Sequence, residues 1–249
     1  MALQEEMEDQ GNWLFKYRGY LPIVILFVAL VVFLFPNFFN IFSFLENINK
    51  AILQWIFLSI SMFGLLIRIY TVGYTPKNTS GRNVEGQLAE TLNTSGIYST
   101  VRHPLYLGNF FMWLGPALLT ENFWFIISFC FFYCVYYERI MFSEEQFLRK
   151  KFGATYLEWA SRTPAFSPKC KNFTKSNLTF SWKKVLKKEK NGLVAVFIIF
   201  SLFDFLGKWI NQETDYNYSL YQATILSVVI YLVLKILKNN TKLLDEAGR

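Results

Sequence analysis

Long blocks of apolar residues constrain this chain more than any other feature of its sequence. A helix needs roughly 20 residues to cross the hydrocarbon core of a membrane. Several blocks reach or approach that length, and a backbone in lipid must satisfy its own hydrogen bonds, so each block is predicted to be a helix. We expect about six transmembrane helices, at residues 20–42, 51–74, 104–120, 122–138, 191–210 and 218–237.

The composition also indicates an all-α integral membrane protein. Hydrophobic residues make up 53% of the chain and charged residues only 17%, whereas soluble domains carry about a quarter charged residues. The first block is too long for the core of a signal peptide and lacks a cleavage pattern, so we expect a retained helix. The third and fourth blocks are joined by residues 120–122 alone, which predicts a tight helical hairpin.

The distribution of lysine and arginine predicts the orientation. The segment between the fourth and fifth blocks, residues 139–190, is rich in basic residues, and such a segment typically stays in the cytoplasm. Counting spans outward from it places both termini and the 75–103 loop on the cytoplasmic side. The membrane is either a bacterial inner membrane or one of the endoplasmic-reticulum type. The net charge of +7 then reflects topology and attraction to anionic lipid; no nucleic-acid motif accompanies it.

Two parts are expected along the chain. Residues 1–170 would form a membrane core of four spans with its cytoplasmic segment, and residues 171–249 a basic interfacial connector followed by a C-terminal helical pair. Helical periodicity continues through residues 138–159, which predicts a cytoplasmic helix after the fourth span. The three cysteines form neither a disulfide framework nor a zinc pattern, so no metal site is expected.

The single histidine of the chain stands where a polar loop meets the third apolar block. It lies between Arg102 and Pro104, with Tyr98 upstream and Tyr106 downstream. One interpretation is structural, with proline at the first position of a helix and an incidental histidine. The other is functional, because arginine and histidine at a helix N-terminus together concentrate donors for a carboxylate or a phosphate.

A pair of carboxylates, Glu144 and Glu145, follows the fourth block. A solvated pair at a helix end is the structural interpretation. The pair also lies near Glu138 and Arg139 where the helix leaves the membrane, a depth at which ionisable groups are expensive and often functional. Ribose hydroxyls or a cationic ligand would suit these carboxylates without a metal. Both motifs are predicted on the cytoplasmic side, where a soluble cofactor meets a lipid-borne substrate.

Two stretches together resemble a known family. The first, "TSGIYSTVRHPLYLGN", is followed about one helical hairpin later by "EEQFLRKKFGATYLEWASRTPAFSP". Over residues 90–168, their order and spacing are similar to those of the isoprenylcysteine carboxyl methyltransferase and phospholipid methyltransferase family. The resemblance implies a membrane-embedded methyltransferase that uses S-adenosyl-L-methionine. Its acceptor would be lipid-like, such as a prenylcysteine carboxylate or a phospholipid amine, and would enter from the bilayer.

The resemblance also implies site residues. The family residues around the cofactor correspond to Thr91, Leu92, Asn93, Tyr98, His103, Pro104, Leu105, Tyr106, Glu144 and Glu145. The argument from the helix start adds Arg102 to this cofactor-binding set. The family arginine that positions the substrate corresponds to Arg139, which we expect to be catalytic together with Glu145. Our hypothesis is that Arg102 and His103 bind the methionine carboxylate, and the glutamates bind the ribose or the amino group.

Two other functions stay open from the sequence. Membrane-bound steroid-type reductases share an Arg-His-Pro-x-Tyr-x-Gly motif and use NADPH. The adjacent glutamates and Asn109, where reductases tend to carry glutamate, favour methyl transfer. A non-enzymatic membrane scaffold would leave the two motifs unexplained. The C-terminal helical pair lies outside the minimal four-span unit and would cover a lipid-entry groove, support a dimer or anchor the chain. The oligomeric state is not predicted.

Overall fold

The computed structural model describes residues 2–35, 49–77, 87, 89–246 and 248, and this part of the chain is all-helical, as predicted. Two short 3-10 helices, Ile97–Ser99 and Cys170–Asn172, lie in the connections. The α-helices of the described part are α1 Leu3–Tyr17, α2 Leu21–Leu34, α3 Lys50–Gly73, α4 Pro104–Leu119, α5 Phe123–Arg162, α6 Trp182–Ile210 and α7 Tyr218–Asn240.

The expected number of spans is not confirmed. Among the described residues, α3, α5, α6 and α7 are long and apolar enough to cross a membrane, and α1 with α2 makes a fifth candidate that is bent by 74°. The helix α4 has 16 residues, about 24 Å at 1.5 Å per residue, which is shorter than a hydrocarbon core of about 30 Å. The structure therefore holds four or five candidate spans. Residues 36–42 of the first predicted span lie outside the described part.

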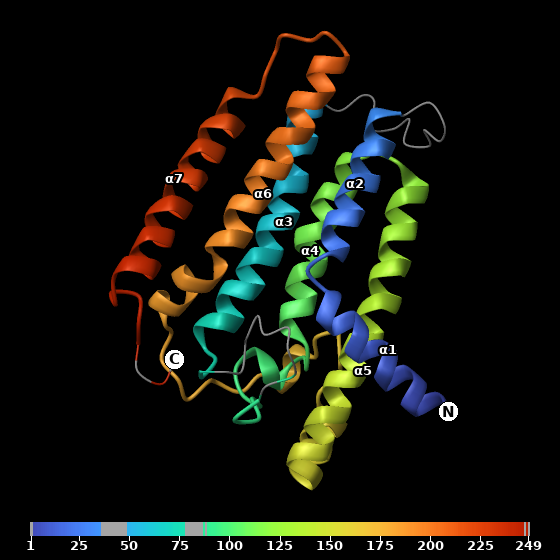
Figure 1. Cartoon of the computed structure of the whole chain (residues 1–249), viewed down its shortest axis with the longest axis vertical. Coiled ribbons are helices and arrows are strands. Elements are labelled where there is room, and N and C mark those ends of the chain that lie inside the picture. Colours follow the sequence, from blue (N-terminus) through green and yellow to red (C-terminus); the bar gives the residue numbers. More distant parts are fainter. Residues whose placement is uncertain (1, 36–48, 78–86, 88, 247, 249) are drawn as a thin grey trace.

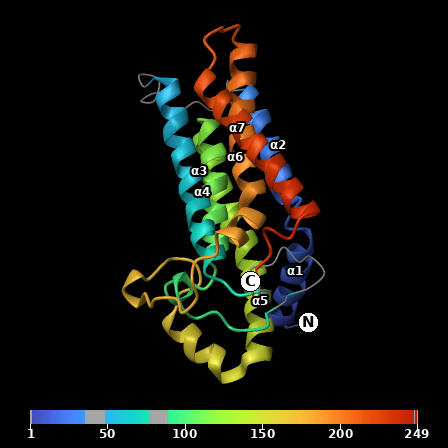
Figure 2. The same cartoon turned by 90° about the vertical axis from the view of Figure 1, so that its left-hand side faces the viewer.

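The long helices stand side by side in one bundle. In Figures 1 and 2, α3, α4 and α6 lie together, α7 packs outside α6, and α2 and α5 stand on the other side. Both termini, residues 89–103 and the basic connection 163–181 lie at the same end of the bundle, where α1 and the second half of α5 project (Figures 1 and 2). We call this the lower end; that it faces the cytoplasm stays a prediction.

Small residues allow α3 and α4 to pack at close range. A Cβ atom on Gly64 of α3 would collide with the backbone carbonyl oxygen of Gly108, and one on Gly115 of α4 would collide with Ser61 Oγ. Such glycine contacts are typical of helices packed in a membrane, because they let two backbones approach. This contact holds α4, which begins with the histidine motif, against the middle of the bundle.

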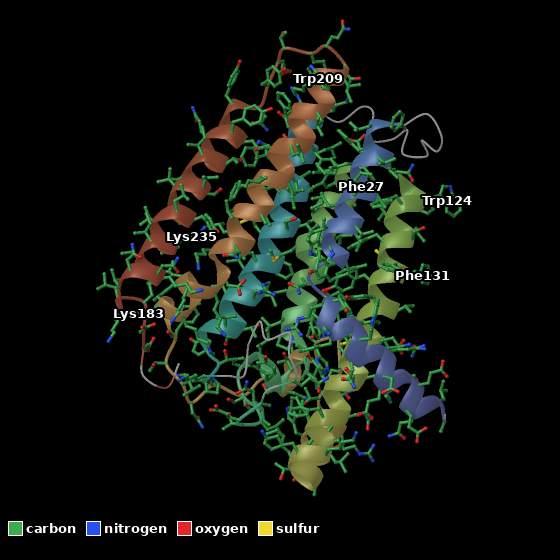
Figure 3. The ribbon with its side chains drawn as sticks, in the orientation of Figure 1. Phe27, Trp124, Phe131, Lys183, Trp209 and Lys235 are labelled. Atoms are coloured by element: carbon green, nitrogen blue, oxygen red, sulfur yellow. The ribbon has the colours of Figure 1, made fainter. Side chains whose placement is uncertain are left out.

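Large apolar side chains cover the outside of the bundle. Phe27, Phe131 and Trp209 are each about two-thirds exposed, and Figure 3 shows Trp124 and Phe131 pointing outward from α5. An apolar surface of this extent is typical of a protein that contacts lipid. Inside, aromatic residues such as Phe57, Phe200 and Tyr133 fill the space between the helices.

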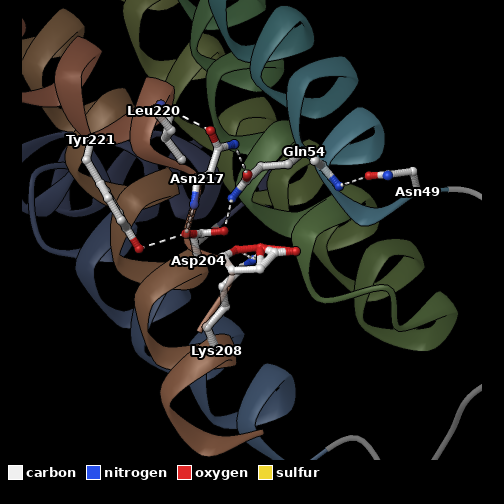
Figure 4. Close-up of polar contacts among 9 residues, drawn as sticks. Asn49, Gln54, Asp204, Lys208, Asn217, Leu220 and Tyr221 are labelled. Atoms are coloured by element: carbon white, nitrogen blue, oxygen red, sulfur yellow. Dashed lines mark hydrogen bonds and ion pairs between the residues drawn. The ribbon is translucent and has the colours of Figure 1, made fainter. Parts of the chain in front are cut away.

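A polar cluster joins α3, α6 and α7 at the upper end. Asp204 of α6 accepts hydrogen bonds from Gln54 Nε2 of α3, at 3.3 Å, and from the Tyr221 hydroxyl of α7, at 2.7 Å. Asn217 Nδ2 donates to Gln54 Oε1 at 2.7 Å, and Figure 4 shows these contacts. Polar side chains that bond across helices stabilise packing in apolar surroundings.

The expected division of the chain into two parts at residue 170 stays a prediction. The helices α3 and α6, which lie on either side of this division in the sequence, are in contact.

Candidate active site

A cavity of about 850 Å³ lies at the lower end of the bundle and extends between the helices. This volume is within the range of ligand pockets, about 300–1,000 Å³. Its polar end includes Gln87, Thr91, Asn93, Tyr98, Arg102, His103, Tyr106 and Glu144. Its apolar end includes Met112, Trp113 and Pro116 of α4 with Ala195, Val196 and Ile199 of α6. One cavity therefore joins a polar compartment to an apolar one.

Backbone hydrogen bonds hold the two sequence motifs together. The N–H groups of Arg102 and His103 donate to the carbonyl oxygens of Pro164 and Ala165, at 2.9 and 3.1 Å. Trp159 Nε1 donates to the carbonyl oxygen of Tyr98 at 3.1 Å. The chain can return in this way because α5 bends at Gly153, whose φ of 54° is favourable for glycine. These hydrogen bonds thus hold the first motif in place against the second.

His103 lies between the two glutamates. Its Nε2 is 2.9 Å from Glu145 Oε1, and its Nδ1 is 3.4 Å from Glu144 Oε2. As predicted, Pro104 occupies the first turn of α4, with His103 as the N-cap residue. The imidazole is buried, with 6% of the side chain exposed. The histidine therefore belongs to a buried charged cluster and is not an incidental residue at a helix start.

Neighbouring side chains complete this cluster. The Tyr106 hydroxyl donates to Glu144 Oε1 at 2.7 Å. Arg102 Nε lies 2.9 Å from Glu145 Oε1 as an ion pair, and Arg102 NH1 donates to the carbonyl oxygen of Ala160 at 2.9 Å. Arg102 and His103, which is cationic when protonated, therefore face two carboxylates, so that the charges of this cluster have partners of opposite sign.

The surroundings change the pKa of His103. Burial lowers this pKa, but the hydrogen bonds and negative charges of Glu144 and Glu145 raise it, and the net pKa is above the ordinary value. The imidazole therefore keeps its proton to higher pH than a free histidine. Burial and the charge of Glu144 also raise the pKa of Tyr98, so its phenol stays protonated and available as a donor.

The structure brings most of the sequence-predicted residues to this cavity. The predicted residues that line it are Thr91, Leu92, Asn93, Tyr98, Arg102, His103, Pro104, Leu105, Tyr106 and Glu144. Glu145 lies behind them and contacts His103 and Arg102.

Arg139 is not among the described residues that line the cavity. It precedes Glu144 by five residues, which is about 140° around a helix of 3.6 residues per turn. Its backbone instead packs against Gly11 of α1. The catalytic role expected for Arg139 therefore stays a prediction that the geometry of the cavity does not support.

Other cavity residues were not predicted from the sequence. Arg18, at the bend between α1 and α2, and Arg68 of α3 both line the cavity. Arg68 is the single charged residue of the block 51–74, and an ionisable residue within a span is a general signal of function. The sequence contains no comparable signal for the residues of α6 that line the cavity, because nothing in it indicates which helix α6 packs against.

Comparison with known proteins identifies the segment that carries this site. Residues 52–155 match the family described as phospholipid methyltransferase. This segment of the chain is therefore similar to that family. The family segment includes most of α3, all of α4 and most of α5, and with them the histidine motif and both glutamates. The helices α1, α2, α6 and α7 lie outside it.

Three curated relatives share part of this chain. A cobalt-zinc-cadmium resistance protein of Cupriavidus metallidurans is 36% identical over 86 residues, which cover 34% of this chain and 39% of that protein. A nickel-cobalt-cadmium resistance protein of Alcaligenes xylosoxydans xylosoxydans is 30% identical over 120 residues, 48% of this chain and 54% of the relative.

The third relative is a protein-S-isoprenylcysteine O-methyltransferase of Schizosaccharomyces pombe, 36% identical over 78 residues, 31% of this chain and 33% of the relative. The chain therefore spans from about a third to about half of the length of the relatives that it matches. No solved structure matches the chain.

Proposed function

We propose that this protein is a membrane methyltransferase that takes a methyl group from S-adenosyl-L-methionine and transfers it to a lipid-like acceptor. The observation that carries the proposal is the cavity, in which a cluster of carboxylates, tyrosines and a histidine continues into an apolar compartment between α4 and α6. The match of residues 52–155 to the phospholipid methyltransferase family supports it.

The polar end fits the chemical groups of the proposed methyl donor. Glu144 offers carboxylate oxygens to ribose hydroxyls or to the amino group, and residues 91–93 offer backbone groups. The aromatic rings of Tyr98, Tyr106 and Trp159 line the same space, and aromatic faces attract cations such as a sulfonium. The donor set and the volume of the cavity are therefore suitable for this cofactor.

The roles first assigned to Arg102 and His103 need revision. Both side chains face the glutamates, at 2.9 Å from Glu145 Oε1 in each case. We therefore propose that they orient Glu144 and Glu145, and that Glu144 makes the direct contact with the methyl donor. A chain of contacts from Arg102 to Tyr106 then holds the polar end in one arrangement before the donor binds, which lowers the entropy lost on binding.

The proposed donor supplies a methyl group bonded to a positively charged sulfur. When a lone pair of the acceptor oxygen or nitrogen forms the new bond to the methyl carbon, the electrons of the carbon–sulfur bond remain on sulfur. An amine acceptor also loses a proton. The protein aligns donor and acceptor, which by itself accelerates a two-substrate reaction greatly, and the apolar walls of α4 and α6 exclude water. A prenylcysteine carboxylate and a phospholipid amine both fit this scheme.

Ligand binding tests the cofactor. The full chain is purified in nanodiscs and titrated with S-adenosylhomocysteine and, separately, with NADPH. We expect S-adenosylhomocysteine to bind and NADPH not to bind. The variant Glu144→Ala should lose about tenfold or more in affinity, since a hydrogen bond to a charged group contributes about 1.5–3 kcal/mol. Binding of NADPH alone would favour the reductase, and binding of neither ligand would favour a scaffold.

Isotopic labelling tests the acceptor. Membrane extracts are incubated with the protein and a donor that carries a labelled methyl group, and the products are separated by mass spectrometry. We expect label in a lipid-like product that the Glu144→Ala variant does not form. Label confined to water-soluble products would contradict the proposed acceptor class.

A further inference from the structure

We propose that α6, which lies outside the family segment, forms the specificity-determining wall for the apolar chain of the acceptor. We further propose that Arg68 is the positioning residue that fixes this wall to the motif helix α4. The inference rests on the proposed function and deepens it, because it assigns the acceptor's hydrocarbon chain to a particular helix face.

Arg68 connects three helices at one point. Its Nε and NH2 atoms donate to the two carboxylate oxygens of Glu189 on α6, each at 2.8 Å. Its NH1 atom donates to Asn109 Oδ1 on α4 at 2.7 Å. Only 14% of the Arg68 side chain and 4% of the Glu189 side chain are exposed. A bidentate, buried pair of this kind has a fixed geometry, and losing one partner leaves an uncompensated charge.

The Arg68 contact lies next to the polar end of the cavity. Asn109 follows Tyr106, a residue of the polar end, by less than one helical turn. Arg68 and Asn109 both line the cavity. The Arg68 contact therefore lies where the polar compartment meets the apolar one, and it fixes the rotation and height of α6 relative to the proposed donor site.

C-terminal to Glu189, one face of α6 lies against the cavity. Gly192, Ala195, Val196 and Ile199 line it, at the spacing of a single helix face. A Cβ atom on Gly192 would lie 3.2 Å from Met112 Cε and 3.4 Å from Leu65 Cδ1. The glycine thus allows α6 to approach α3 and α4 closely, and the small side chain of Ala195 leaves the space between α6 and α4 open.

The side chains that line the apolar end of the cavity determine which kind of ligand group fits there. Its walls offer aliphatic and aromatic carbon atoms from Met112, Trp113, Val196 and Ile199. A polar group placed there would lose hydrogen bonds to water without gaining others, whereas a hydrocarbon chain gains from burial. The occupant is therefore an acyl or isoprenoid chain, and a larger side chain at residue 195 would shorten the chain that fits.

Acceptor kinetics test the wall. The variant Ala195→Phe is compared with the unmodified protein on two acceptors, N-acetyl-S-farnesylcysteine and N-acetyl-S-butylcysteine. We expect the ratio of kcat/KM for the farnesyl over the butyl acceptor to fall by about tenfold or more. The affinity for S-adenosylhomocysteine should stay the same, which also shows that the variant folds. The matched control is Ile198→Phe, which adds a ring at a position that is 46% exposed and does not line the cavity.

Conservative and disruptive variants test the positioning role. Glu189→Gln keeps the shape of the side chain but removes its charge, and Arg68→Lys keeps the charge but removes the bidentate geometry. We expect both variants to raise KM for the farnesyl acceptor by about tenfold while the affinity for S-adenosylhomocysteine is unchanged. A loss of donor affinity equal to the loss of acceptor affinity would overturn the positioning role.

A measurement without turnover separates the inference from the proposed function. Photoreactive palmitic acid is incorporated into nanodiscs with the full chain, and the crosslinked peptides are mapped. We expect labels on residues 192–199 of α6 facing the cavity, reduced in Ala195→Phe and retained in Ile198→Phe. Labels equal in both variants would overturn the inference, even if methyl transfer occurs. Absence of S-adenosylhomocysteine binding, with the cavity labelled, would instead overturn the proposed function.

Discussion

At the scale of single residues, the site depends on how a histidine and two glutamates share their charges. His103 contacts both carboxylates, and Tyr106 and Arg102 extend the cluster on either side. Each of these residues contacts at least one other member of the cluster. A substitution is therefore expected to act on the ligand through the arrangement of the remaining members.

The raised pKa of His103 predicts how stability depends on pH. A folded-state pKa above the unfolded value of about 6.5 stabilises the fold fully below that pH, and this stabilisation is lost as the pH rises through the folded value. The Tm difference between the protein and His103→Gln should therefore be largest in acid and shrink toward alkaline pH. Scanning calorimetry over a pH series measures it. A difference that is constant with pH would contradict the charged histidine.

Tyr106→Phe tests the hydroxyl that donates to Glu144 at 2.7 Å. The ring remains, so the packing of α4 is kept, but a charge-assisted hydrogen bond worth about 1.5–3 kcal/mol is removed. We expect the affinity for S-adenosylhomocysteine, measured by calorimetric titration, to fall. The control is Tyr136→Phe, which removes a hydroxyl bonded to the carbonyl oxygen of Leu14 and does not line the cavity. Equal losses in the two variants would assign the effect to stability alone.

At the scale of elements, close packing of α3 against α4 positions the histidine motif. A methyl group on Gly64 would collide with the backbone of α4. Gly64→Ala should therefore lower the Tm and destabilise the fold by about 1–3 kcal/mol. Gly19→Ala is the control, because a Cβ atom there has no atom within 4 Å among the described residues. A Tm change of the same size in both variants would contradict the packing argument.

At the scale of the whole molecule, the orientation can be tested with the native cysteines. Cys170 is exposed in the basic connection at the lower end, and Cys134 is exposed on the middle part of α5. A membrane-impermeant maleimide should label Cys170 in inside-out vesicles but not in right-side-out ones, because basic connections stay in the cytoplasm. Cys170→Ser should abolish this labelling. Labelling from the outside only would reverse the predicted topology.

The sequence by itself determined the helical class and most residues of the polar end. Apolar blocks specify helices because a backbone in lipid has no other partners, and the two motifs name residues that the structure brings to one cavity, from Thr91 to Glu144. The number of spans was less predictable, because α4 is apolar but only 16 residues long.

Only the tertiary structure decided which helix faces meet. Arg139 lies close to the glutamates in sequence but packs against α1, whereas Arg68 and Glu189 are 121 residues apart and form a bidentate pair. Periodicity shows that a segment is a helix and which of its sides is apolar. In a membrane helix nearly every side is apolar, so the choice of partner depends on shape and on a few polar contacts. The packing of α6 against α3 and α4 places one of its faces along the cavity.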